Sequence, residues 1–122
     1  MGRIVRLLLT RERSSGMVKF DPERFEDKYI HYFPQLQRAY KNAFNTMNNE
    51  FDSTLIHAID QQVLNESEPM YDTESESFYV DLPDDPYDRL TAVVIDEAKF
   101  DSVLEQYQTE IRSELRRVFG LQ

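Results

Sequence analysis

Apolar side chains recur at steps of three and four residues between residues 25 and 47 of the chain. A helix has about 3.6 residues per turn, so this spacing places the side chains on one face and predicts helical structure. Pro34 lies inside the pattern, where proline lacks a backbone N–H and clashes with the preceding turn. We therefore expect two abutting helices or one kinked helix, with Asp21 as N-cap and Pro22 in the first turn. The stripe consists of Phe25, Tyr29, Tyr32, Leu36, Tyr40, Ala43 and Met47.

A third helix is predicted to begin after Asp52 or Ser53, because either side chain can accept a hydrogen bond from the first turn. It should continue to about Asn65, since asparagine tolerates the left-handed conformation that often ends a helix. Its apolar face is made by Leu55, Ile56, Ile59 and Val63.

The hydrophobic period changes from helical to alternating after Pro69. "SFYVDLP" alternates apolar and polar residues, which predicts a half-buried strand paired with "PMYD" across the turn "TESE". "DDPYDRL" predicts a turn or one short helical turn. "LTAVVID", residues 90–96, is rich in β-branched residues and predicts a further strand, buried on both faces.

The last helix is predicted to follow Asp96, which can cap it, and to end at Gly120. Acidic residues lead this segment and arginines come late, which suits the helix dipole. Its stripe contains Phe100, Val103, Leu104, Tyr107, Ile111, Leu115 and Val118.

The elements together predict an α+β fold with three N-terminal helices, a small antiparallel or mixed sheet of two to three strands, and a long C-terminal helix. Residues 1–16 have a different composition, and we expect a disordered arm or an upstream extension of the start. An organellar presequence is the alternative for this arginine-rich stretch. Residues 17–122 are expected to form a single domain.

The charge is distributed unevenly along the chain. The net charge is −9, but residues 1–16 carry four arginines against one glutamate, so the remaining 106 residues stand at −12. Such a field repels nucleic acid and anionic lipid, and we expect neither nucleic acid nor a membrane as partner. Ten arginines accompany only four lysines. Acidic proteins with few lysines are expected in molar salt, although an ordinary acidic protein is the alternative.

Several kinds of chemistry are excluded by composition. The chain has no cysteine, and its three glycines lie at positions 2, 16 and 120, so thiolate chemistry and glycine-rich phosphate loops are ruled out. The two histidines are too few for a zinc site without carboxylates. Candidate magnesium ligands occur in the acidic loop, with a solvated turn as the alternative, and no cofactor is predicted. These candidates are Asp81, Asp84, Asp85 and Asp88.

"HAIDQQVLNESEPMYD" places an unusual number of polar side chains at the end of the third helix. At about 100° per residue, His57, Asp60 and Gln61 fall together opposite the apolar face. The apolar face seats the helix without them, so they could contact a partner, or they could form a solvated face. The predicted contact surface is His57, Asp60, Gln61, Asn65, Glu66 and Glu68.

Four segments carry a resemblance to a known family. "KFDPERFEDKYIHYFPQLQRAYKNAF", "HAIDQQVLNESEPMYD", "LPDDPYDRL" and "RRVFG" resemble a family of small acidic proteins of halophilic archaea that is catalogued as a domain of unknown function. The likeness covers about residues 18 to 121. It implies salt adaptation and a cytoplasmic setting, and it assigns no catalytic residue.

We therefore expect a non-enzymatic interaction or regulatory module of a high-salt cytoplasm, acting on a partner protein or as a homodimer. The alternative hypothesis is a small metal-assisted hydrolase that uses His57, Asp60 and the acidic loop 81–88. An enzyme should show a concave pocket in which these groups converge, whereas a binding module should show an exposed apolar or mixed patch.

Overall fold

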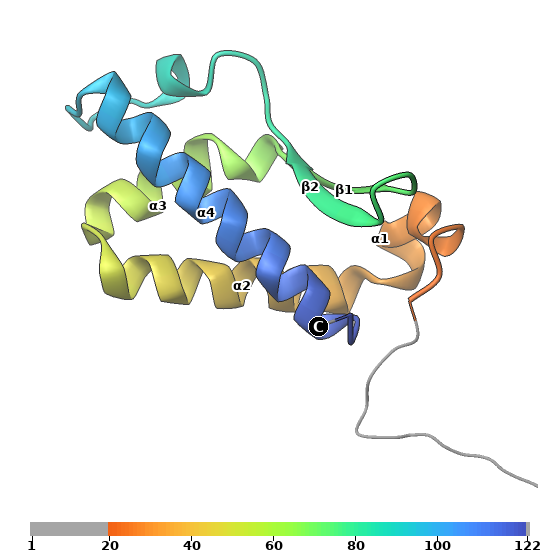
Figure 1. Ribbon diagram of the computed structural model, residues 1–122. Helices are drawn as coiled ribbons and strands as arrows, with labels where there is room; N and C mark the ends of the chain where they lie inside the picture. Colours follow the sequence, from red (N-terminus) through yellow and green to blue (C-terminus); the bar gives the residue numbers. More distant parts are fainter. Residues whose placement is uncertain (1–19, 122) are drawn as a thin grey trace, which may run out of the picture.

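The computed structural model describes residues 20–121, so the predicted arm, residues 1–16, lies outside the described residues. The predicted α+β class is confirmed: N-terminal helices lead into a two-stranded antiparallel sheet, and a long helix closes the chain (Figure 1).

The N-terminal helical region breaks at the predicted place. A 3-10 turn, η2 (Arg24–Asp27), runs into the short helix α1 (Lys28–His31), and α2 (Phe33–Glu50) follows after a break at Tyr32. Pro34 lies in the first turn of α2, where its missing N–H costs no helical hydrogen bond.

The start of this region differs from the prediction, because the N-cap of η2 is Glu23 and not Asp21. Asp21 instead caps the turn before the helix, since its Oδ1 accepts a hydrogen bond from the backbone N–H of Glu23 at 3.0 Å. Aspartate commonly stabilises a turn by bonding the backbone two residues on.

Helix α3 (Ser53–Gln62) is capped as predicted by Asp52, whose Oδ2 accepts a hydrogen bond from the N–H of Leu55 at 3.0 Å. The helix ends earlier than predicted, and Asn65 lies in a 3-10 turn, η3 (Leu64–Glu66). The backbone of Asn65 is not left-handed. Val63 continues the apolar face of the helix, and the 3-10 turn that follows lets the next residue, Leu64, be buried as well.

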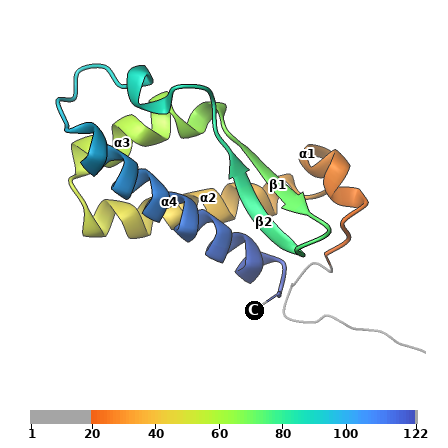
Figure 2. The same cartoon turned by 45° about the horizontal axis from the view of Figure 1, so that its top comes forward.

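The predicted hairpin is confirmed. Strand β1 (Glu68–Asp72) pairs antiparallel with β2 (Ser77–Asp81), as Figure 2 shows. Phe78 and Val80 are buried and the alternate residue Tyr79 is exposed, which is the alternation that the sequence predicts.

The prediction of a further strand over residues 90–96 was wrong, because this segment is an irregular connection. The side chain of Val94 is fully exposed, and Val93 and Ile95 are half-buried against the core. Ala92 has a positive φ of 63°, and the N–H of Thr91 donates to Gln62 Oε1 at 2.6 Å. The left-handed backbone at Ala92 interrupts an extended conformation, and the N–H of Thr91 bonds a side chain, so this segment is not a third strand of the sheet.

Helix α4 (Glu97–Val118) has the predicted start and end. Asp96 Oδ2 accepts a hydrogen bond from the N–H of Lys99, and Gly120 has a positive φ of 69°. The N–H of Leu121 bonds the carbonyl of Arg116 at 2.8 Å, which completes a Schellman ending. Every residue of the predicted stripe is buried.

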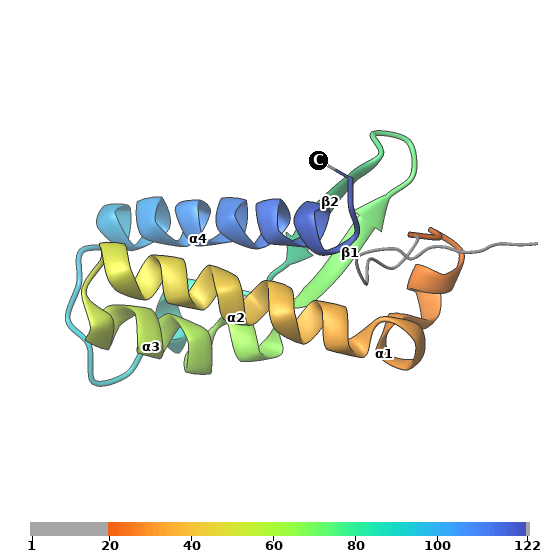
Figure 3. The same ribbon diagram turned by 90° about the horizontal axis from the view of Figure 1, so that it is seen from below.

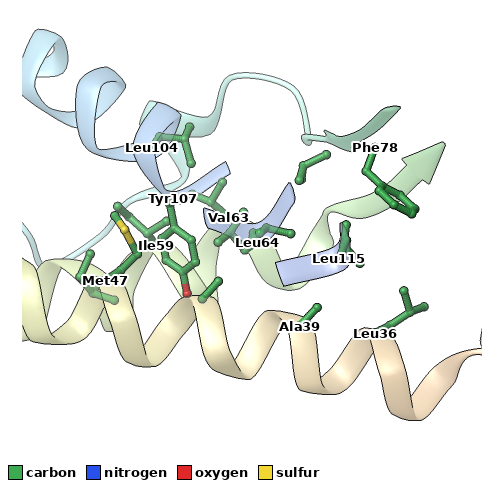
Figure 4. Close-up of a cluster of buried hydrophobic side chains, with 14 of the residues drawn as sticks. Leu36, Ala39, Met47, Ile59, Val63, Leu64, Phe78, Leu104, Tyr107 and Leu115 are labelled. Carbon is green, nitrogen blue, oxygen red and sulfur yellow. The ribbon is translucent and has the colours of Figure 1, made fainter. Parts of the chain in front are cut away.

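Helix α2 lies between α3 and α4, and the hairpin packs through β2 on α4 (Figure 3). The buried side chains of these elements form a continuous core, in which Tyr107 of α4 reaches toward α2 (Figure 4). An aromatic cluster closes the end near the hairpin; it contains Phe20, Phe25, Tyr32, Tyr71, Phe78 and Phe119. None of the helices between residues 20 and 121 has the length and apolar content needed to cross a bilayer.

Candidate functional site

A pocket of about 310 Å³ opens where α1 and the first half of α2 meet the end of α3, the turn η3 and the start of β1. We call it the α2–α3 pocket. Its lining residues are Tyr29, Phe33, Leu36, Gln37, Tyr40, Asp60, Leu64, Asn65, Ser67 and Pro69.

One wall of the pocket is aromatic because of the break between α1 and α2. Tyr29 was predicted to lie on the buried stripe, but its side chain is 53% exposed, and Lys28 is buried in its place. Steps of three and of four residues after Phe25 are both helical, so spacing alone could not decide between positions 28 and 29. Phe33, one turn after Tyr29, is 46% exposed at the start of α2.

Asp60 supplies the carboxylate of the opposite wall. It lies on α3, and partial burial raises the pKa of its carboxyl above the ordinary value, while the neighbouring His57 opposes this shift. Burial disfavours the charged form of a carboxyl group unless a cation compensates it. Within residues 20–121, Asp60 forms no ion pair with a lysine or arginine.

The tyrosines around the pocket have raised pKa values. Burial raises the pKa of Tyr40 to about 12, although the hydrogen bond between its hydroxyl and Ser67 Oγ, at 3.2 Å, acts in the other direction. Burial and the charge of Glu68 raise the pKa of Tyr29. On α4, burial and the charge of Asp60 raise the pKa of Tyr107. Burial is the largest cause for all three tyrosines, and nearby carboxylates add to it.

His57 lies outside the lining of the pocket. Its side chain is exposed, its Nδ1 lies 2.9 Å from the backbone oxygen of Ser53, and its ring meets the ring of Phe44 edge-on at 5.0 Å. The hydrogen bond to the backbone oxygen requires a proton on Nδ1.

The remaining residues of the predicted contact surface have different environments. Asn65 lines the pocket together with Asp60, and Gln61 is exposed on α3. Glu66 pairs with Arg89 and Glu68 pairs with Lys28, each at 2.6 Å. The two glutamates therefore hold parts of the fold together.

All four candidate metal ligands of the acidic loop are exposed. They are Asp81, Asp84, Asp85 and Asp88. Asp85 adopts a left-handed conformation before the 3-10 turn η4 (Pro86–Arg89), and the carbonyl of Asp84 accepts a hydrogen bond from Arg89. In the part of the chain that the structure describes, no three histidine, aspartate or glutamate side chains are grouped closely enough to hold a metal ion.

The pocket offers binding groups and no paired catalytic groups. Ser67 is the one serine in the lining. Its hydroxyl donates a hydrogen bond to the carbonyl of Leu64 at 2.7 Å and also contacts the Tyr40 hydroxyl. No histidine, lysine or arginine lines the pocket. The lining therefore contains no serine–histidine pair of the kind used in covalent catalysis.

Sequence reasoning missed three contacts around this region. Lys28 and Glu68 are separated by 40 residues, and Gln62 and Thr91 by 29. Tyr40 packs partly buried against the core, as the stripe predicts, and its hydroxyl also bonds Ser67 across 27 residues. No local pattern marks such pairs, because each depends on how distant elements pack.

A model of a family of unknown function, DUF5783, matches residues 17–122. No curated protein and no solved structure was found that matches the chain. The match covers more than half of the sequence, and the chain therefore belongs to the DUF5783 family.

Proposed function

We propose that this protein is a non-enzymatic interaction module that binds a partner protein in a high-salt cytoplasm. The observation that carries the proposal is a run of exposed apolar side chains, of which Tyr29 and Phe33 line the α2–α3 pocket and Ile30 follows Tyr29 in α1. Tyr29, Ile30 and Phe33 are 53%, 79% and 46% exposed, and all three lie within five consecutive residues. We call these three residues and the pocket the docking face.

Exposed apolar side chains that gather around a concave site are typical of interaction surfaces, whereas single ones are common on any protein. Two further large apolar residues, Tyr79 and Val94, are exposed elsewhere in the described chain. Val94 lies in the irregular connection after η4 and does not line the pocket. It therefore offers a matched control for substitutions on the docking face.

Charge argues for a basic partner. Residues 17–122 carry a net charge of −12, so the carboxylates of the docking face match a partner rich in lysine and arginine. At high salt this attraction acts only between charges in direct contact. The same excess charge supports the high-salt setting, where short screening lengths weaken self-repulsion.

Site-specific photocrosslinking at native salt tests the proposal. A photoreactive residue at position 30 should give a discrete crosslink to one other protein, and the same residue at position 94 should not. The purified partner should then bind Ile30→Ser at least tenfold more weakly than the unchanged protein, and Val94→Ser equally well.

Ile30 and Val94 are both exposed, so neither substitution removes core packing, and melts should confirm that both variants fold. Equal crosslinking at the two positions, or equal binding by the two variants, would overturn the proposal. A crosslink that joins two copies of this chain would show that the docking face binds a second copy of the chain and not another protein.

A further inference from the structure

Aromatic rings and a carboxylate line the same pocket from opposite elements. Tyr29, Phe33 and Tyr40 come from α1 and α2, and Asp60 comes from α3. The face of an aromatic ring carries negative charge density and attracts a cation that lies over it. A pocket that combines such rings with a carboxylate has the chemistry to bind an ammonium or guanidinium group.

Asp60 differs from the two nearby glutamates in having no lysine or arginine as an ion-pair partner within residues 20–121. Lys28 neutralises Glu68 and Arg89 neutralises Glu66, each at 2.6 Å, but within residues 20–121 no lysine or arginine pairs with Asp60. The exposed cations Arg38 and Lys41 of α2 line a neighbouring hollow and not this pocket. The carboxylate in the pocket is thus left available for a cation from outside.

The surroundings of Asp60 make the binding of such a cation more favourable. Partial burial has removed water from the carboxylate, which raises its pKa, and His57 is the group that opposes this shift. A half-buried charge without a partner destabilises the folded protein until a ligand compensates it. The charge of Asp60 also raises the pKa of the buried Tyr107, so this charge acts on the neighbouring core.

The size of the pocket restricts what can enter. Its volume of about 310 Å³ lies at the lower end of the range of about 300 to 1,000 Å³ that ligand sites occupy. One long side chain fits such a space better than a nucleotide does, and the acidic field disfavours phosphates.

We infer that the α2–α3 pocket binds the guanidinium or ammonium head of an arginine or lysine side chain that the partner protein inserts between the aromatic wall and Asp60. This inference rests on the proposed function for the source of the side chain. The polar groups of Asn65 and Ser67 lie in the same lining and can orient the head of the inserted side chain.

The test uses N-acetyl-L-arginine amide as probe and N-acetyl-L-citrulline amide as its uncharged control, because citrulline keeps the shape and loses the charge. Two-dimensional amide NMR spectra at fixed salt should show saturable shifts with the arginine probe, confined to residues around the pocket such as Asp60, Asn65 and Ser67. The citrulline probe should bind at least fivefold more weakly.

Asp60→Asn should weaken arginine binding at least fivefold, while Asp84→Asn, which removes the same charge from the exposed loop, should leave binding unchanged within twofold. Retained amide spectra will show that both variants fold. Equal binding of the two probes, equal binding by the two variants, or shifts spread over all acidic surfaces would overturn the inference. Tetramethylammonium binding tenfold tighter than the arginine probe would assign the pocket to a small organic cation instead.

The two proposals fail separately. Probe binding needs no partner protein, so it can succeed even if Ile30→Ser leaves partner binding unchanged. In the converse case, a partner crosslinks at position 30 while the arginine probe gives no saturable shifts. That result would support the docking face and show that Asp60 does not bind a cation of the partner.

Discussion

Replacing Glu68 by glutamine removes the charge that neutralises the buried ammonium of Lys28. The side chain of Lys28 is 6% exposed and that of Glu68 is 46% exposed, with Nζ and Oε2 2.6 Å apart. The pair joins α1 to β1 across 40 residues. The two partners differ in burial, so the two single substitutions should differ in cost.

Leaving one partner of a fully buried ion pair uncompensated costs about 3 to 5 kcal/mol. The cost should be smaller here, because Glu68 is half-exposed and Lys28 Nζ also lies 5.3 Å from the ring centre of Phe25 and 5.2 Å from that of Tyr29. Each cation–π contact contributes about 0.5 to 2 kcal/mol. We therefore expect Glu68→Gln to lower the free energy of unfolding by roughly 1 to 2 kcal/mol.

Lys28→Met keeps the apolar stem and removes the buried charge, while the carboxylate of Glu68 can be hydrated again. Such replacements are often neutral or stabilising, so we expect a change below about 1 kcal/mol in either direction. Urea denaturation followed by circular dichroism measures both variants.

Glu66→Gln is the matched control, since it removes the same charge from the more exposed pair with Arg89 and should cost less than about 1 kcal/mol. In thermal melts of a domain of about 100 residues, 1 kcal/mol corresponds to a shift of roughly 4 °C or more. If Lys28→Met costs as much as Glu68→Gln, the unequal burial of the two partners does not determine the cost of removing each charge.

Three further predictions concern charge and the polar face of α3. Because burial raises the pKa of Asp60 from its ordinary 3.8, the folded state holds that proton more tightly than the unfolded chain, and stability falls as pH rises through the interval between the two pKa values. Asp60→Asn should therefore be slightly more stable than the unchanged protein at pH 7 and equally stable below the unfolded pKa, which urea titrations at both pH values will show. The melting temperature should rise steeply between about 0.01 M and 1 M KCl, as the screening length falls from roughly 30 Å to 3 Å; a flat melting temperature would contradict salt adaptation. His57→Ala should change the free energy of unfolding by no more than about 0.5 kcal/mol, because the side chain is exposed, and a larger loss in a melt would show that its contacts with Ser53 and Phe44 matter more than expected.

The helices, caps and hairpin could be predicted because their signals are local in the sequence. Asp52 and Asp96 each accept a hydrogen bond from the third residue after them, and Gly120 supplies the left-handed conformation that ends α4. Pro34 forces the break before α2 by its own geometry. In the hairpin, alternation determined that Phe78 and Val80 face the core.

The candidate site could be predicted only in part. Asp60 and Asn65 were selected because they lie on the polar side of a helix end, and both line the pocket. Glu66 and Glu68 were selected by the same reasoning, yet each pairs with a cation of this chain. Sequence cannot separate the two cases, because the cations come from distant residues.

The sequence by itself determined which segments are helical, where α3 and α4 begin, and most of the apolar faces, because these properties depend on residues three or four apart. Only the tertiary structure decided that residues 90–96 form no strand, since a strand needs a neighbouring edge and Gln62 engages the N–H of Thr91 instead. It also decided that Lys28 is buried while Tyr29 is exposed, and that Asp60 lines the same pocket as three aromatic residues. Burial and charge compensation depend on the packing of whole elements, and no local spacing encodes them.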